Sequence, residues 1–270
     1  MRFLVFLALL TGALFSCKKG VRGNDNKPAV FDSTPSPFMQ RTVVKLDSRT
    51  EQNAWLQLPI HYNSGFDTEK YPLLVFFNGK FESAQYGGLE KLIPIGVPKF
   101  MADSIRFSFD TGSKKQQFIV LCPQSENGFP SPISINLILD YMVSKYRVDA
   151  SRIYLTGVSS GAASIFSYLT NKQEYANRIA AAVPMSSTAL ESEKVANLSF
   201  IGNAGVATQI YCGTADNVFN QNKSYADAIN RSRPGLAVFN AYNSGHGSWN
   251  PFYDPKAKPN IYEWMLQHRN

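Results

Sequence analysis

The chain has 270 residues, a length that suits one large α/β domain better than two small ones. Its 44% apolar content is ordinary for a globular protein and argues against disorder over the bulk of the chain. The formal charge is +7, but part of it lies in the first 27 residues and the other basic residues are scattered, which argues against nucleic-acid binding.

The first 17 residues predict an export signal. Arg2 is followed by an apolar stretch, Phe3 to Phe15, that is too short to cross a bilayer comfortably. The segment Leu14-Phe15-Ser16-Cys17 resembles a bacterial lipobox, although Phe15 stands where a small residue is commoner. We therefore expect an exported cell-envelope lipoprotein, periplasmic or outer-membrane associated, with a membrane anchor on Cys17. The alternative is a plain secretion signal in which Cys17 is incidental.

Residues 18–37 predict a flexible linker, because they combine Lys, Gly, Asn, Asp and Ser with three prolines. The folded domain is expected to cover residues 38–270. Its two cysteines, Cys122 and Cys212, lie in apolar strand-like runs, and we expect buried free thiols rather than a disulfide. No Cys-x-x-Cys pair or histidine cluster indicates a metal site, and we expect no cofactor.

The sequence of the domain predicts an α/β fold with a mostly parallel sheet and helices on both faces, because expected strands and helices mostly alternate from Pro72 onward. Two earlier segments alternate in hydrophobicity and predict an antiparallel hairpin at the sheet edge. Residues 79–117 and 184–207 are expected to be rich in loops. The expected strands are 41–46, 54–58, 71–77, 118–122, 153–155, 179–183, 209–212 and 236–242, and the expected helices are 134–146, 162–169, 225–231 and 261–267.

The pentapeptide Gly157-Val-Ser159-Ser160-Gly161 stands between an expected strand and an expected helix. This is the setting of a nucleophile elbow, a tight turn that strains its central residue and leaves the hydroxyl at the tip. The flanking glycines are needed because a Cβ there would collide with a neighbouring strand or helix. Ser159 is thus the candidate nucleophile, the alternative being an ordinary turn built of small residues.

A serine nucleophile needs a base within hydrogen-bond reach, and the base needs an orienting acid. Of the three histidines, only His246 follows an expected late strand, in a loop flanked by glycines. Functional loops of parallel sheets lie at the carboxyl ends of strands, which favours His246 over His61 and His268. Asp216, which follows the strand at 209–212, is the candidate acid. The chain order Ser159, Asp216, His246 is that of the α/β-hydrolases.

A serine hydrolase also needs donors for the oxyanion and a pocket for the substrate, and the remaining candidate residues are assigned to these two roles. An oxyanion needs two donors, and we expect the backbone N–H of Ser160 and a second N–H from Gly79 or Lys80. Asn78, Phe129 and Trp249 are expected to line the substrate pocket. The aromatic residues Tyr86, Phe129, Trp249 and Phe252 look exposed in the sequence, and we expect them to belong to the pocket wall or the core rather than to a carbohydrate platform.

Several segments together resemble exported bacterial α/β-hydrolase esterases related to polyhydroxybutyrate depolymerases and feruloyl esterases, a group that includes proteins labelled as peptidases or phospholipase/carboxylesterases. The resemblance covers residues 55–267, and its most specific part is Val148-Asp149-x-x-Arg152-Ile-Tyr-x-Thr-Gly157. It implies that Ser159, Asp216 and His246 act as nucleophile, acid and base. The other segments are 71–79, 120–124, 181–186, 213–218 and 245–249.

The chain departs from that family pattern at three positions. Asn78-Gly79 replaces the usual His-Gly in the oxyanion loop, Ala162 replaces a second glycine after the elbow, and Gly247 stands where Asp is common. None of these changes removes a member of the expected triad, so we expect an active enzyme.

We expect a monomeric serine hydrolase that cleaves acetyl, feruloyl or other short acyl esters, possibly on polysaccharide, through an acyl-enzyme. The absence of an obvious long lid insertion disfavours a lid-gated lipase. Two alternatives remain open: a serine peptidase with the same residues, and a catalytically weak, lipid-anchored glycan-binding protein on the same scaffold.

Overall fold

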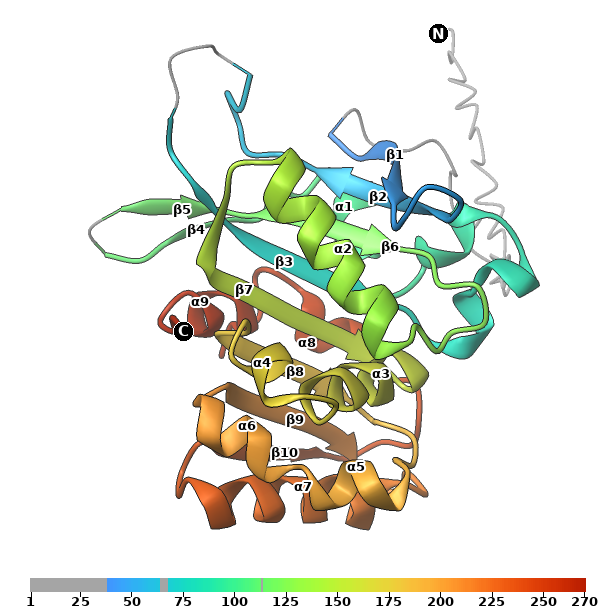
Figure 1. The fold of residues 1–270 in the computed structure, drawn as a ribbon, viewed down its shortest axis with the longest axis vertical. Coiled ribbons are helices and arrows are strands. Elements are labelled where there is room, and N and C mark those ends of the chain that lie inside the picture. Colours follow the sequence, from blue (N-terminus) through green and yellow to red (C-terminus); the bar gives the residue numbers. More distant parts are fainter. Residues whose placement is uncertain (1–37, 64–67, 113) are drawn as a thin grey trace, which may run out of the picture. The chain divides into compact units, whose positions relative to one another are not determined.

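The computed structural model describes residues 38–63, 68–112 and 114–270, and its central feature is an eight-stranded sheet of order β1-β2-β6-β3-β7-β8-β9-β10 (Figure 1). The short strands β4 and β5 pair separately as a hairpin. The strands are β1 (Gln40–Lys45), β2 (Glu51–Gln57), β3 (Tyr71–Phe77), β4 (Ser108–Asp110), β5 (Lys115–Gln117), β6 (Ile119–Pro123), β7 (Val148–Val158), β8 (Ala181–Met185), β9 (Ala207–Gly213) and β10 (Ala237–Tyr242).

The large sheet is parallel except at one edge. β1 runs antiparallel to β2, with Thr42 opposite Ala54, and β2 runs antiparallel to β6, with Trp55 opposite Cys122. From β6 through β10 every neighbouring pair is parallel. The expected mostly parallel sheet with an antiparallel N-terminal hairpin at its edge is therefore confirmed.

Helices cover both faces of this sheet (Figure 1). One hydrophobic cluster joins the sheet to α2, α3, α4, α6 and α7, and a second joins it to α1, α8, α9 and one 3-10 helix. The helices are η1 (Lys80–Glu82), η2 (Ala84–Tyr86), η3 (Leu89–Leu92), α1 (Gly96–Ala102), α2 (Pro132–Lys145), α3 (Ser160–Leu169), α4 (Gln173–Ala176), α5 (Ser192–Ala196), α6 (Ser199–Ala204), α7 (Phe219–Ser232), α8 (Asn250–Tyr253) and α9 (Ile261–Met265).

The continuous apolar run of β3 explains why both faces are covered. Successive side chains of a strand point to opposite faces, so Val75 and Phe77 enter the first cluster while Leu74 and Phe76 enter the second. Every residue of the strand is buried. A strand without a polar face requires a core on each side of the sheet.

Side chains cap the N-termini of two helices, α2 and α9. The Ser131 hydroxyl accepts the backbone N–H of Ser134 at 3.1 Å, and Pro132 occupies the first helical position of α2, where its missing N–H costs no hydrogen bond. Asn260 caps α9 in the same way by accepting the N–H groups of Tyr262 and Glu263. The cap moves the start of α2 two residues ahead of the expected Ser134.

The two segments expected to be loops are richer in structure than predicted. Residues 79–117 contain three 3-10 helices, α1 and the β4–β5 hairpin, and residues 184–207 contain α5 and α6. These elements are short, and their hydrophobic periodicity is too brief to stand out in the sequence. Cys122 and Cys212 are free and buried, as expected. They do not pair because β3, β7 and β8 lie between their strands.

All described residues belong to one unit of the chain, Ser33–Asn270. The expected signal at 1–17, with its lipobox cysteine, and the expected linker at 18–37 lie outside the described residues. Among those that are described, no helix has the length and apolar character needed to cross a membrane.

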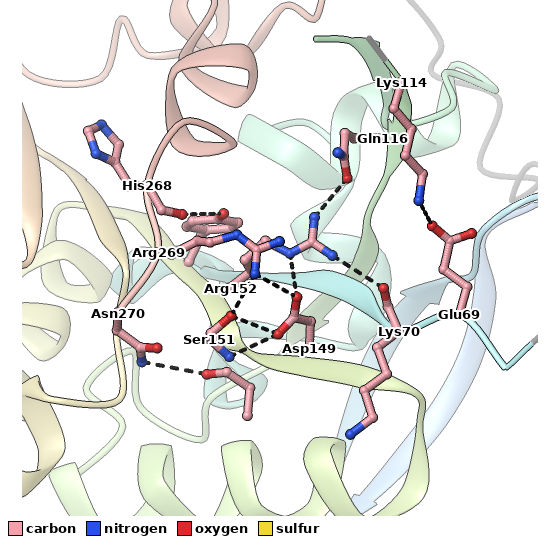
Figure 2. Close-up of polar contacts among 12 residues, drawn as sticks. Glu69, Lys70, Lys114, Gln116, Asp149, Ser151, Arg152, His268, Arg269 and Asn270 are labelled. Atoms are coloured by element: carbon pink, nitrogen blue, oxygen red, sulfur yellow. Dashed lines mark hydrogen bonds and ion pairs between the residues drawn. The ribbon is translucent and has the colours of Figure 1, made fainter.

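A polar network ties the start of β7 to three other parts of the chain (Figure 2). The nearly buried Arg152 donates to Asp149 at 2.6 Å, to Gln116 of the β4–β5 hairpin at 2.7 Å and to the carbonyl of Lys70 at 3.2 Å. Arg269 forms an ion pair with Asp149 at 3.5 Å. The network therefore holds the strand that leads to Ser159 at its amino end, opposite the elbow.

Asp149 should make the free energy of unfolding depend on pH in the acid range. Burial by itself raises the pKa of Asp149, but hydrogen bonds from Ser151 and Arg152 outweigh it and leave the pKa lowered. A carboxyl whose pKa is lower in the folded state stabilises the fold above its unfolded pKa and loses this contribution as pH falls through the folded value. We expect Asp149→Asn to be less stable than wild type at pH 7 and to lose less further stability on acidification.

Urea unfolding at pH 7 and at pH 3 measures this effect. Asp227→Asn is the matched control, because Asp227 forms an exposed pair with Lys223 at 3.3 Å. Equal acid dependence in wild type and Asp149→Asn would contradict the assignment.

Candidate active site

Ser159 lies at a strained turn between β7 and α3. Its backbone has φ 54° and ψ −118°, in the positive-φ region that residues other than glycine rarely adopt. The backbone N–H of Ser159 donates to the carbonyl of Met185 in the neighbouring β8 at 2.9 Å. Ser159 is partly exposed while both of its chain neighbours are buried, so the turn presents this one side chain outward.

The two glycines of the pentapeptide lie against the end of β3. A Cβ on Gly157 would lie 2.7 Å from the carbonyl oxygen of Phe77, and a Cβ on Gly161 would lie 2.3 Å from the same atom and 2.6 Å from the carbonyl oxygen of Asn78. No real Cβ approaches backbone atoms so closely. The glycines thus allow the elbow to pack directly against the strand that leads into the oxyanion loop.

The three residues that the sequence singled out as a triad meet at the carboxyl end of the sheet. His246, in the loop after β10, has its Nε2 3.0 Å from Ser159 Oγ and its Nδ1 2.8 Å from Asp216 Oδ2 in the loop after β9. The Asp216 side chain is fully buried, whereas that of His246 is 40% exposed. The buried acid is shielded from water, and the imidazole remains open to a substrate.

The charge on Asp216 fixes the tautomer of His246. Burial by itself raises the pKa of Asp216, but hydrogen bonds from His246, the N–H of Val218 and the Ser186 hydroxyl outweigh it and lower the pKa. Asp216 is therefore an ionised, acceptor-only carboxylate at neutral pH. His246 must donate from Nδ1, which leaves Nε2 free to accept the proton of Ser159.

The loop after β3 lies beside the nucleophile, as the oxyanion assignment requires. A Cβ on Gly79 would lie 3.7 Å from Ser159 Cβ and 2.7 Å from Glu82 Oε2. Burial raises the pKa of Glu82, and hydrogen bonds from its own N–H and from that of Gly79 partly offset this. Gly79 and Lys80 therefore both remain candidates for the second donor.

The backbone N–H groups of Ser160 and Lys80 have no acceptor among the described residues. Ser160 also begins α3, where the first N–H groups have no partner within the helix. Such N–H groups are the donors that a developing oxyanion needs.

Asn78 occupies a different place from the pocket wall that its position in the sequence suggested. Its side chain is buried and donates to the carbonyl of Gly79 at 2.7 Å, while its Oδ1 accepts from the N–H and the hydroxyl of Ser125 at 3.2 and 3.3 Å. Asn78 thus clamps the oxyanion loop against the segment that follows β6, and burial keeps its amide away from a substrate.

Asn78→Asp should misplace that loop with little change in shape. The variant keeps an acceptor for Ser125 but places a carboxylate oxygen, in place of a donor, against the carbonyl of Gly79. We expect kcat/KM for p-nitrophenyl acetate to fall about 100-fold, the effect of losing one oxyanion donor. The control is Asn127→Asp, which leaves a carboxylate oxygen to accept the N–H of Phe129 in an exposed loop. Equal kinetics in the two variants would contradict the clamp.

The other aromatic candidates are divided between surface and core. Phe129 is 46% exposed and lies beside two hollows of about 430 and 190 Å³. Trp249 is buried and packs edge-on against His246, with ring centroids 5.1 Å apart, so it supports the imidazole. Tyr86 is exposed and contacts Phe81, and Phe252 is half-buried against Tyr211 and Tyr242.

Several residues at the site carried no recognisable signal in the sequence. Thr188 and Val218 line an open hollow of about 480 Å³ together with Asp216 and His246. The folded chain brings Glu82 next to Gly79 of the oxyanion loop and Ser186 near the acid Asp216. Such partners belong to no local motif, so the sequence cannot reveal them.

Comparison with solved structures identifies the class of fold. A ferulic acid esterase aligns with a TM-score of 0.53 and 17% identity over 85% of this chain and 99% of its own. Esterase 2 from Thermogutta terrifontis, phosphoramylated by tabun, aligns with a TM-score of 0.53 and 13% identity over 87% of this chain and 94% of its own. A candidate dipeptidyl aminopeptidase IV from Bacteroides ovatus aligns with a TM-score of 0.54 and 17% identity over 80% of this chain and 33% of its own.

The chain therefore has the α/β-hydrolase fold, with the elbow, acid and histidine loops at the carboxyl ends of parallel strands. No protein-family model matches the sequence, and no curated protein matches it.

Proposed function

We propose that this protein is a serine hydrolase that cleaves carboxylic esters through an acyl-enzyme. The observation that carries the proposal is the continuous hydrogen-bond chain from Ser159 through His246 to the buried Asp216. A hydroxyl is a weak nucleophile at neutral pH, and this arrangement supplies both the base that removes its proton and the carboxylate that orients the base.

In the proposed reaction, His246 Nε2 takes the proton of Ser159 while Oγ attacks the ester carbonyl. The N–H of Ser160 and a second N–H, from Gly79 or Lys80, receive the negative charge that develops on the carbonyl oxygen. The imidazolium then protonates the leaving alkoxide, the alcohol departs and the acyl group remains on Ser159. Water, activated by the same imidazole, releases the acid and restores the serine. Asp216 stays ionised throughout and stabilises the imidazolium.

The nature of the bond cleaved is the finer part of the proposal. Ester cleavage is favoured by the open hollow beside His246, because an exposed cleft accepts small acyl esters directly. We propose acetyl, feruloyl or other short acyl esters, possibly on polysaccharide, in line with the similarity to a ferulic acid esterase. A peptidase would use the same residues, and the similarity to a candidate dipeptidyl aminopeptidase supports that alternative.

A fluorophosphonate probe and a substrate panel test the proposal. We expect the probe to label the protein lacking residues 1–17 on the peptide that contains Ser159. We also expect turnover of acetyl, butyryl or feruloyl esters to exceed that of long-chain esters and of matched anilides. Absence of labelling would overturn the serine-hydrolase proposal and favour a binding protein. Faster turnover of anilides than of esters would favour a peptidase.

We further propose that the protein is anchored to the cell envelope by lipid on Cys17, because Leu14-Phe15-Ser16-Cys17 follows an apolar signal-like stretch. Incorporation of labelled palmitate in a bacterial host should be lost in Cys17→Ser. Incorporation that persists in this variant would contradict the anchor.

A further inference from the structure

A hollow of about 340 Å³ lies at the edge of the sheet that is opposite to the candidate active site. Its lining includes Phe38, Leu58, Ile60 and Arg106. β2 runs against β6, so the end of β2 and the residues that follow it lie beside the amino ends of the parallel strands (Figure 1). The catalytic candidates follow the carboxyl ends of their strands. The hollow is therefore separate from the site of the proposed reaction.

Arg106 is fixed in this hollow through its backbone and through its side chain. The buried Gln57 binds both chain neighbours of Arg106: its Nε2 donates to the carbonyl of Ile105 at 3.0 Å, and its Oε1 accepts the N–H of Phe107 at 3.1 Å. The guanidinium lies over the ring of Phe38, 3.4 Å from the ring centroid. The position of this cation is thus set before any ligand arrives.

The guanidinium of Arg106 still has hydrogen bonds to donate. Its Nη1 reaches the carbonyl of Leu58 at 3.4 Å, which is a long bond. No acidic side chain pairs with it among the described residues, and none of those that line the hollow is acidic. None of its nitrogens is among the buried polar atoms that lack a partner in the described part of the chain, so its free N–H groups are open to the hollow. Such a fork of donors matches the oxygens of a phosphate group.

Apolar side chains and a second cation lie at the same edge. Phe38 and Ile60, which line the hollow, are both 38% exposed. Lys70 directly precedes β3 and is exposed, and only its carbonyl takes part in the polar network of Figure 2. Its ammonium has no acidic partner among the residues that the structure describes. Cations beside exposed apolar side chains are typical of surfaces that bind anionic membranes.

The expected linker joins the domain at this same hollow. Phe38 directly follows residues 18–37, and the expected anchor Cys17 lies 21 positions before it. A flexible linker of this length, as the sequence predicts, has a root-mean-square extension of about 25 Å. An anchor on Cys17 would therefore keep this edge of the domain near the membrane, where a high local concentration favours even a weak contact.

We propose that this edge, the Arg106 face (Phe38, Ile60, Lys70 and Arg106), docks on the anionic phospholipid surface of the membrane that holds the anchor. Arg106 and Lys70 bind headgroup phosphates, and Phe38 and Ile60 enter the interface. The inference rests on the proposed anchor on Cys17 and not on the ester chemistry. Docking at the amino ends of the strands turns the carboxyl ends, with the catalytic candidates, away from the lipid, so a substrate reaches them from the solvent side.

Hydrogen–deuterium exchange on the tethered chain tests the docking. The chain that begins at Cys17 is coupled through this thiol to a maleimide phospholipid, in vesicles of phosphatidylcholine with or without phosphatidylglycerol. Cys122 and Cys212 are buried, which leaves Cys17 as the reactive thiol. Backbone exchange in residues 58–63 should slow about fivefold when phosphatidylglycerol is present, the effect of one basic residue at an anionic surface.

Substitutions assign the protection to the Arg106 face. Arg106→Gln should lose it, and Arg106→Lys should keep most of it, because lysine retains the charge. Arg49→Gln is the matched control, because Arg49 is exposed in the turn between β1 and β2, at the opposite edge of the sheet. Where Arg106→Gln does not fold, Ile60→Ser gives the second test, and it should lower the protection as well.

Equal exchange in both kinds of vesicle would overturn the docking, as would protection that persists in Arg106→Gln. Protection of the loop at 243–249 in place of 58–63 would turn the active-site edge to the lipid and reject the proposal. Protection of 58–63 by dissolved glycerol phosphate, without an effect of vesicles, would mark a site for a free phosphate ester instead. Because the coupling supplies the tether, a failed palmitate test in cells would remove only the natural anchor, and ester turnover does not enter the measurement.

Discussion

Ser159→Ala should lower kcat for p-nitrophenyl acetate by about 10⁴-fold or more and abolish labelling by a fluorophosphonate. Without Oγ there is no acceptor for the acyl group, and His246 has no hydroxyl to activate. Losses of this size accompany removal of the nucleophile in serine hydrolases, and the residual rate comes from the oxyanion donors and from binding. Steady-state kinetics and mass spectrometry of the labelled peptide measure both effects.

The adjacent Ser160 is the natural comparison for this substitution. Its hydroxyl is buried without a partner among the described residues, and it lies inside the first turn of α3, so it is not placed to attack a substrate. Labelling that persists in Ser159→Ala and disappears in Ser160→Ala would reverse the assignment of the nucleophile.

Gly161→Ala should both destabilise the fold and impair the site. Its added Cβ would lie 2.3 Å from the carbonyl oxygen of Phe77 and 2.6 Å from that of Asn78, so backbone must move at the end of β3. Overpacking of a tight interior costs about 1–3 kcal/mol, and a clash with two backbone carbonyls places this variant at the upper end. Because the displaced backbone leads into the oxyanion loop, we also expect kcat/KM to fall.

Urea unfolding of Gly161→Ala beside Gly245→Ala gives the comparison. A Cβ on Gly245 would meet no atom within 4 Å, and Gly245 does not have a positive φ. The free energy of unfolding should drop in the first variant and remain near wild type in the second. A Gly161→Ala variant as stable as Gly245→Ala would show that the elbow can separate from β3 without cost.

The sheet could be predicted well because its signals are local. The apolar run Tyr71–Phe77 has no polar face, and the structure buries all of it between two cores. The alternating segments before it form the antiparallel edge. The Ser, Asp and His candidates could be found because strand-end loops of a parallel sheet share one edge.

The supporting residues could not be predicted, because their roles depend on contacts between distant segments. Asn78 suggested a pocket wall, yet it binds Ser125, which lies 47 positions away. Trp249 also suggested a pocket wall, and the turn into α8 places its ring against His246. The carboxylate of Glu82 lies beside Gly79 of the oxyanion loop, which only the conformation of η1 reveals.

The segment that most specifically resembles known hydrolases has a structural task. Asp149 and Arg152 join β7 to the β4–β5 hairpin and to Lys70, and Thr156 donates to the carbonyl of Val183 at 2.7 Å. None of these side chains contacts Ser159. A motif next to a nucleophile can therefore report how a strand is anchored, and chemistry has to be argued from the site itself.

Because of the order of the strands, the proposed ester turnover can be used to measure how completely the sheet has formed. Ser159 and His246 are 87 positions apart, and His246 lies in the loop that follows β10, the last strand in the chain. A chain interrupted by incomplete synthesis or by proteolysis before β10 would contain the serine without its base. Ester turnover during refolding would therefore count only molecules whose last strands have docked, while circular dichroism would also register partly folded ones.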